Sequence, residues 1–280
     1  MPVHPPAPRD LPGLIDAYAV TTAAVLALGE GLEPGQESLP TDCPGWTVLD
    51  QIRHVASIEA MLLGEELPEI DVSGMPHVRN DFGALIEKYL HRRRDREVRD
   101  VLDELREVRE RRLADLRDPE LTLTTESEGP LGRTTVGSLL GLRIFDIWTH
   151  EQDLREALGV AGGLDASGAS VAITRILRAL PRALESTGGV VPGDTVRIVI
   201  EGPVSADETI TIPGEVAEGS DSAEGDAAEG AAGRSATVSM TTRAFTRRAA
   251  GRWEISDLGA QVEGDADLVT QVLTALAITP

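Results

Sequence analysis

Two side chains that can bind a metal or move a proton lie one helical turn apart in the run RIFDIWTHEQDLREALG, residues 143–159. Asp146 and His150 have the i, i+4 spacing, so a helix places both of them on one face. This spacing suits two ligands that hold one metal ion from one helix, although a structural ion pair has the same spacing. Asp153 follows three residues after His150 and either orients its imidazole or pairs with Arg155.

A third candidate ligand, His54, lies beside the apolar stripe of another expected helix. In a helix bundle, two inward-facing helices can bring one histidine to an Asp–His pair, and two imidazoles with a carboxylate are a common catalytic zinc shell. A lone histidine at such a position can also be an ordinary core residue. His4, His77 and His91 lie in a leader, a Pro-containing loop and a charged helix, which favours surface positions for all three.

The elements that must position these residues follow from apolar spacing and from Gly and Pro punctuation. Helices are expected over 11–32, 47–67, 81–117 and about 134–158, with a polar loop over 118–133. Thr47 is the expected N-cap of the second helix, with Asp50 at the capping-box position. The charges of the third helix alternate in sign, which predicts a solvated face with i, i+4 ion pairs. Four helices with moderate loops predict a bundle over residues 10–160.

The second part of the chain, residues 165–280, has a different pattern. It predicts, in order, a helix over about 167–186, strands over 195–202 and 208–214, a strand with a short helix over 235–251, and a strand, a turn and a helix at the C-terminus. Residues 215–236 are rich in Gly, Ala, Ser and acidic residues, which predicts a disordered acidic loop. The expected fold class is therefore α+β, a four-helix bundle followed by a smaller α+β domain.

The composition narrows the classes of partner. The 280 residues carry a formal net charge of -21, which argues against nucleic acid and against anionic membrane surfaces. Cys43 is the single cysteine, so no intramolecular disulfide can form, which suits a reducing cytoplasm. The Pro-rich N-terminus lacks the apolar core of a signal peptide, and no run is expected to reach the roughly 18 to 20 apolar residues of a membrane span. A cytoplasmic protein is expected, without nucleic-acid or membrane partners.

The sequence lacks the common catalytic motifs that would indicate a reaction. GxGxxG, P-loop, HExxH and GxSxG patterns are absent from the sequence, so nucleotide binding, metzincin chemistry and α/β-hydrolase chemistry lack their usual anchors. Cys43 precedes an expected helix, whose N-terminus could lower the pKa of the thiol, but without a neighbouring histidine it is expected to be structural. The remaining signal is therefore the set of histidines and carboxylates.

Two motifs, read together, resemble one known family. TDCPGWTVLDQIRHVASIE (41–59), followed about ninety residues later by RIFDIWTHEQDLREALG, is similar to the mycothiol-dependent maleylpyruvate isomerase-like family, whose N-terminal part is a DinB-like metal-binding four-helix bundle. The C-terminal run VEGDADLVTQVLTALAITP resembles a sterol-carrier-protein-2-like domain. The resemblance therefore spans nearly the whole chain.

This resemblance implies a site and a chemistry. It implies that His54, Asp146 and His150 bind zinc or another divalent metal, with Asp146 at a position where relatives often have Glu. It also implies that the metal holds the thiol of mycothiol as a thiolate, which attacks a small electrophilic substrate. The outcome is an isomerisation if the thiol leaves again and an S-transfer if it stays attached.

The resemblance adds one residue from the second part of the chain. Arg252, in AAGRWE, matches a Gly-Arg pair of the family and is implied as a catalytic residue that clamps a carboxylate or the thiol cofactor. An arginine that ends a short helix explains the same position. Arg243 and Arg247 are less well placed for such a role.

Other classes of function fit the same residues. One is a non-catalytic metal-containing binding or regulatory protein on the same scaffold, which a closed shell of four protein ligands would favour. Another is a bundle without metal, in which Asp146 and His150 form a structural ion pair. An open coordination position beside a thiol-sized cleft would favour the enzyme. The sequence leaves the oligomeric state open.

Overall fold

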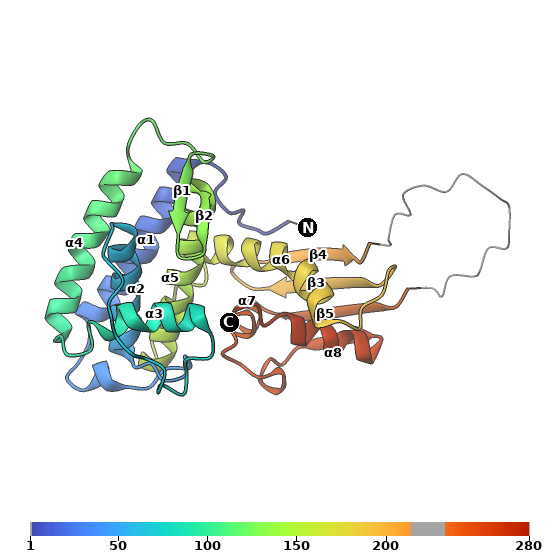
Figure 1. Ribbon diagram of the computed structural model, residues 1–280. Coiled ribbons are helices and arrows are strands. Elements are labelled where there is room, and N and C mark those ends of the chain that lie inside the picture. The colour runs from blue at the N-terminus through green and yellow to red at the C-terminus, as the bar shows by residue number, and fades with distance from the viewer. Residues whose placement is uncertain (1, 214–232, 280) are drawn as a thin grey trace, which may run out of the picture. The chain divides into compact units, whose positions relative to one another are not determined.

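The computed structural model describes residues 2–213 and 233–279, and Figure 1 shows its elements. The helices are α1 (Leu11–Glu30), α2 (Val48–Leu62), α3 (Asp81–His91), α4 (Val98–Leu116), α5 (Val136–Leu158), α6 (Ser167–Thr187), α7 (Thr242–Ala249) and α8 (Ala266–Ala275). The strands are β1 (Glu126–Gly129), β2 (Gly132–Thr135), β3 (Thr195–Glu201), β4 (Ala206–Thr211), β5 (Ser235–Thr241) and β6 (Gln261–Gly264). Helices come first and a mixed α/β segment follows, which confirms the predicted α+β class.

The chain divides into two compact units. The helical unit is Pro6–Ala172, and the α+β unit is Ile173–Thr279 together with the N-terminal stretch that ends at Pro5. The boundary lies inside α6. The N-terminal stretch belongs to the α+β unit because His4 and Ser205 exchange two backbone N–H···O bonds, each of 2.8 Å.

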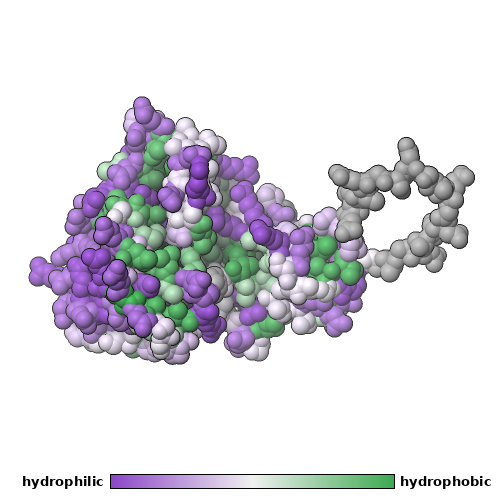
Figure 2. Space-filling model, in the orientation of Figure 1, coloured by the Kyte–Doolittle hydropathy of each residue, from purple (hydrophilic) through white to green (hydrophobic). Residues whose placement is uncertain are grey.

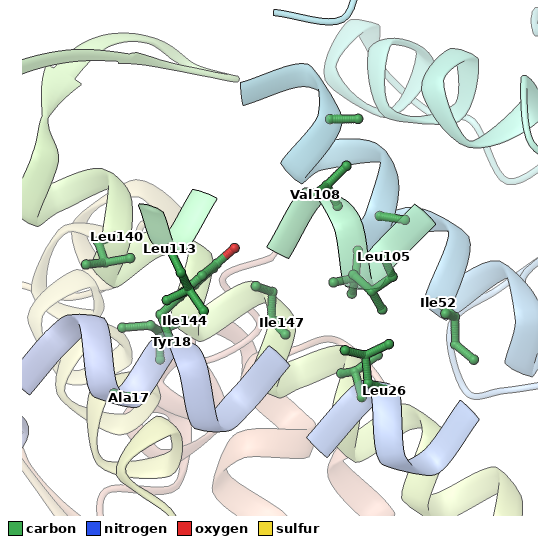
Figure 3. Packing of buried hydrophobic residues seen from close by; sticks show 14 of the residues in the cluster. Ala17, Tyr18, Leu26, Ile52, Leu105, Val108, Leu113, Leu140, Ile144 and Ile147 are labelled. Atoms are coloured by element: carbon green, nitrogen blue, oxygen red, sulfur yellow. The ribbon is translucent and has the colours of Figure 1, made fainter. Parts of the chain in front are cut away.

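One hydrophobic core holds the helical unit together, and Figure 3 shows part of it. Tyr18, Ile52, Leu105 and Ile144 come from α1, α2, α4 and α5 and have no exposed surface. Burial of one such side chain is worth about 1.5 to 3 kcal/mol, so the core fixes these four helices against one another.

Among the described residues, α1 is the one helix that is long and apolar enough to cross a membrane by length and composition, with a mean hydropathy of 1.6. The expectation that no run reaches such a length is therefore wrong for residues 11–30. Tyr18 and Val25 on this helix are completely buried in the core. Packing in the bundle accounts for the apolar character of α1.

Two helices of the bundle are buried on every side over part of their length. In α2 this stretch is residues 48–60, and in α5 it is residues 147–154. An ordinary amphipathic helix exposes its polar positions, whereas here the polar positions are also inside the protein. The predicted capping box of α2 is confirmed, because Thr47 Oγ accepts from the N–H of Asp50 while the Asp50 carboxylate accepts from the N–H of Thr47.

The single helix predicted over 81–117 is wrong, because α3 and α4 are separate helices with a break at residues 92–97. The break is stabilised by Arg53 of α2. Its guanidinium donates to the backbone carbonyls of Arg94 at 2.7 Å and Arg96 at 2.9 Å. A side chain that is distant in sequence thus satisfies carbonyls that leave the helical pattern, which local propensity does not reveal.

The exposed face of α4 carries the predicted alternating charges, and Figure 2 shows hydrophilic surface over this helix. Arg99 lies 3.9 Å from Asp103, and Arg111 lies 4.0 Å from Glu107, both as i, i+4 pairs. Exposed pairs of this kind contribute only about 0.3 to 0.5 kcal/mol each. The stability of α4 therefore depends mainly on the apolar residues that it buries.

The loop predicted over 118–133 contains a short antiparallel hairpin. In it, β1 pairs with β2, with Glu126 opposite Thr135 and Gly129 opposite Gly132. Gly132 has a φ of 94°, a conformation that glycine adopts readily. Thr135 then caps α5 by accepting from the N–H of Ser138, so the hairpin leads directly into the helix that carries the candidate ligands.

The α+β unit contains a four-stranded sheet in the order β4-β3-β5-β6. The central pair β3 and β5 is parallel, and both outer pairs are antiparallel. Alternate residues Val196, Ile198 and Ile200 of β3 are buried, as the period of a half-buried strand requires. Of the predicted acidic loop at 215–236, residues 215–232 lie outside the described residues, and residues 235–236 begin β5.

Candidate functional site

His54 of α2 and Asp146 and His150 of α5 converge inside the helical unit; we call them the His–Asp–His cluster. Nε2 of His54 lies 3.1 Å from Oδ2 of Asp146, and Nε2 of His150 lies 3.6 Å from Oδ1 of the same carboxylate. The two imidazole centroids are 4.4 Å apart. One nitrogen or oxygen of each residue lies within 4.8 Å of the others, so the structure brings together the three candidate ligands.

The cluster is closed on the imidazole side and open on the carboxylate side. The side chains of His54 and His150 are 4% and 8% exposed, whereas that of Asp146 is 29% exposed. Burial lowers the pKa of His54 to about 4, because the attraction of Asp146 does not offset the loss of solvent. His54 is therefore a neutral imidazole near neutral pH, which is the form that binds metals.

The second imidazole is shifted in the opposite direction. Burial acts to lower the pKa of His150, but the carboxylates of Asp146 and Asp153 outweigh it and raise the pKa. Gln51 Oε1 lies 2.5 Å from His150 Nδ1, and Gln51 Nε2 donates to Oγ1 of Thr41 at 2.7 Å. This chain of contacts assigns the hydrogen to Nδ1 of His150 and leaves Nε2 available as a ligand.

Asp153 has the position that an orienting carboxylate requires. Its Oδ2 lies 3.4 Å from Nδ1 of His150, and the residue has no exposed surface. Its alternative partner, Arg155, instead donates through Nε to Glu151 at 2.8 Å. Asp153 and Gln51 therefore approach the same ring nitrogen of His150.

The sequence did not point to Arg143, which binds the carboxylate of the cluster, or to Glu59, which binds Arg143. Arg143 Nη1 donates to Asp146 Oδ2 at 2.7 Å, and its Nε donates to Glu59 Oε1 at 2.8 Å. Burial acts to raise the pKa of Asp146, but Arg143 and the two imidazoles outweigh it and hold the pKa well below its usual range. Both residues lie inside the two recognised motifs, and the i, i+3 spacing of Arg143 and Asp146 was the available signal.

An indole covers the imidazole side. The ring of Trp46 lies 4.9 Å from that of His54 and 5.6 Å from that of His150. Its Nε1 donates to Oε2 of Glu87 at 3.1 Å, and Nε2 of His77 lies 3.0 Å from the same oxygen. His77 was expected at the surface, but its side chain is only 17% exposed and it supports the anchor of Trp46.

The other candidate residues belong to other segments of the chain and are not part of the His–Asp–His cluster. His4 belongs to the α+β unit, and His91 ends α3. Cys43 lies in the turn before α2 and is half-buried. Arg252 lies in the α+β unit after α7, where its Nη1 donates to the carbonyl of Ala250 at 3.0 Å. A catalytic role for Arg252 stays a prediction.

The donor set of the cluster fits a tetrahedral transition metal such as zinc. Two ligands at about 2.1 Å from a tetrahedral ion lie about 3.4 Å apart. The separations of 3.1 Å from His54 Nε2 to Oδ2 and of 3.6 Å from His150 Nε2 to Oδ1 of Asp146 are close to that value, and one ligand atom of each residue lies within 4.8 Å of the others. Nδ1 of His54 is buried without a hydrogen-bond partner among the described residues. Three protein ligands and an accessible carboxylate edge are typical of zinc sites that keep a position for an exchangeable ligand.

Comparison with known proteins places the helical unit in a family. Residues 18–155 match the family described as the mycothiol maleylpyruvate isomerase N-terminal domain. The crystal structure of the mycothiol-dependent maleylpyruvate isomerase has a similar fold, with a TM-score of 0.54 and 17% identity. A histidine-to-alanine mutant of the mycothiol-dependent maleylpyruvate isomerase gives a TM-score of 0.58 and 16% identity. Each comparison covers 90% of this chain and 92% of the other. No curated protein matches the chain in sequence.

Proposed function

We propose that this chain, which belongs to the mycothiol-dependent maleylpyruvate isomerase family through residues 18–155, is a zinc enzyme that activates mycothiol toward a small electrophile. The observation that carries the proposal is the geometry of the His–Asp–His cluster, in which two imidazoles and one carboxylate face a common point. The accessible side of Asp146, 29% exposed, leaves a route for an exchangeable ligand.

Zinc held by the cluster would lower the pKa of a coordinated thiol and keep it as a thiolate near neutral pH. The residues of the chain supply binding and orientation. His54 binds as a neutral imidazole, while Gln51 and Asp153 hold the ring of His150 so that Nε2 faces the cluster. Trp46 covers both rings and excludes water from the imidazole side.

Two reactions are compatible with this site. Both begin with thiolate attack on a small electrophilic substrate, and they differ in whether the new C–S bond breaks again, as in an isomerisation, or remains, as in an S-transfer. Arg252 is proposed as the group that binds the carboxylate of the substrate or of the thiol cofactor. The cytoplasm is the proposed compartment, with metal binding in the domain at 10–160 and Arg252 in the domain at 165–280.

The first test is the metal content of the purified full-length protein and of His150→Ala, with His91→Ala as the control histidine. About one zinc ion per wild-type and control chain is expected, and His150→Ala is expected to lose it because two ligands remain. Undiminished zinc in His150→Ala would refute the site.

The second test follows free thiol and maleylpyruvate together, with mycothiol or glutathione as the thiol. Loss of free thiol with the substrate indicates S-transfer, and loss of maleylpyruvate at constant thiol indicates isomerisation. Firmly bound zinc without either reaction would favour the non-catalytic binding or regulatory protein. Activity with glutathione alone would contradict mycothiol as the cofactor.

A further inference from the structure

Glu59 is a buried carboxylate near the His–Asp–His cluster. None of the side chains that donate hydrogen bonds to it belongs to that cluster. It has no exposed surface, and it accepts from Arg143 Nε at 2.8 Å, Arg112 Nε at 3.2 Å and Tyr18 OH at 2.7 Å. Desolvation of a carboxylate costs several kcal/mol, and replacing buried ion pairs by apolar residues is often neutral or stabilising. Packing of the bundle alone therefore does not account for Glu59.

The connection between Glu59 and the cluster runs through one guanidinium. Arg143 is 3% exposed and bridges two carboxylates, since Nε donates to Glu59 and Nη1 donates to Asp146 Oδ2. The bond to Oδ2 leaves Oδ1 of Asp146 turned toward Nε2 of His150. Arg143 thereby orients the carboxylate of the cluster.

The same guanidinium opposes metal binding by its charge. In a buried environment a cation beside the carboxylate competes for it and repels a divalent ion. Glu59 accepts from both Arg143 and Arg112, so this buried network consists of two carboxylates, Asp146 and Glu59, and two guanidinium groups. Glu59 places a carboxylate against Arg143, shared with Arg112, and so offsets part of the charge of Arg143 without occupying a ligand position.

We propose that Glu59 is a positioning residue for the metal site: it holds Arg143 against Asp146 and offsets part of its charge, so that Asp146 is oriented and still available to a divalent cation. The inference rests on the proposed metal site. It assigns a function in metal affinity to Glu59, the last residue of the first motif, which had no evident role.

The test compares the zinc affinity of wild-type full-length protein, Glu59→Gln and Tyr18→Phe by competition with a chromophoric chelator, with zinc alone as the probe. Glu59→Gln keeps the shape of the side chain and removes its charge, and a loss of about 10- to 100-fold in affinity is expected. Tyr18→Phe removes a hydrogen bond to the same carboxylate but preserves the charge, and a change within about twofold is expected. The absorption spectrum of the cobalt-substituted protein should change in Glu59→Gln, because Asp146 is reoriented.

A double variant, Glu59→Gln with Arg143→Gln, removes both buried charges and keeps the inference testable where Glu59→Gln does not fold. Its affinity is expected to be at most about tenfold below wild type, because the orientation of Asp146 by Arg143 is lost but no uncompensated cation remains beside that carboxylate. Wild-type protein that does not bind zinc would refute the proposed metal site itself. If wild type binds zinc, three results would overturn the role of Glu59 alone. These are an unchanged zinc affinity in Glu59→Gln, a loss in Tyr18→Phe equal to that in Glu59→Gln, and a loss of more than about tenfold in the double variant.

Discussion

Zinc should stabilise the folded helical unit, and His150→Ala should abolish that stabilisation. The ligands come from two helices, and His54 and Asp146 are 92 positions apart in the sequence. The unfolded chain therefore does not present a preformed site, and binding energy adds to folding energy. Free zinc at 100 times its dissociation constant stabilises the folded state by about 2.7 kcal/mol. For a unit of this size, that corresponds to an increase in Tm of about 5 to 11 °C.

The variant also has an expected cost without metal. His150→Ala leaves Oε1 of Gln51 and Oδ2 of Asp153 facing the space of the lost imidazole, at positions now 2.5 and 3.4 Å from Nδ1. Removing one hydrogen-bond partner of a buried polar group costs about 1 to 3 kcal/mol. The zinc-free variant is thus expected to unfold at a lower temperature than zinc-free wild type.

Differential scanning calorimetry measures both effects on protein that has been treated with a chelator and then reloaded with zinc. The control is His91→Ala, which removes a histidine of α3 and should keep the full zinc-dependent shift. The assigned ligand set would be contradicted if His150→Ala retained the shift, or if wild type showed none at a zinc concentration where binding is saturated. Loss of the shift in the control as well would point to general destabilisation.

Three further measurements examine the support of the site and the bundle. Gln51→Leu removes the acceptor 2.5 Å from His150 Nδ1, so zinc affinity should fall about 10- to 100-fold, and an unchanged chelator-competition curve would contradict this orienting role. Because the pKa of His150 is raised, a proton competes with zinc for this imidazole as the pH falls. Below that pKa the apparent zinc affinity should decrease about tenfold per pH unit. A zinc affinity that does not change between pH 8 and 6 would contradict this competition. Ile144→Ala in the core should lower the free energy of unfolding, measured with denaturant, by about 2 to 5 kcal/mol. A decrease below about 1 kcal/mol would contradict this value and would mean that neighbouring side chains fill the cavity.

Local signals predicted much of the fold. Thr47 and Asp50 form the expected capping box because that contact joins residues three apart in the chain. The break between α3 and α4 was not predictable in the same way, because the carbonyls of Arg94 and Arg96 are satisfied by Arg53, more than forty positions earlier. The hairpin β1–β2 was missed because its four-residue strands lack a run of β-branched or aromatic residues.

The sequence by itself determined that Asp146 and His150 share a helix face, since helical periodicity sets this relation wherever the helix lies. Its two motifs also indicated His54 as their partner. Only the tertiary structure decided that the three side chains meet, with 3.1 and 3.6 Å between their facing atoms. The burial of Glu59 and Arg143 was likewise a tertiary outcome, because both side chains lie inside the helical unit, 0% and 3% exposed. A helical period tells which residues share a face, but the number of faces that are buried depends on what packs around the helix.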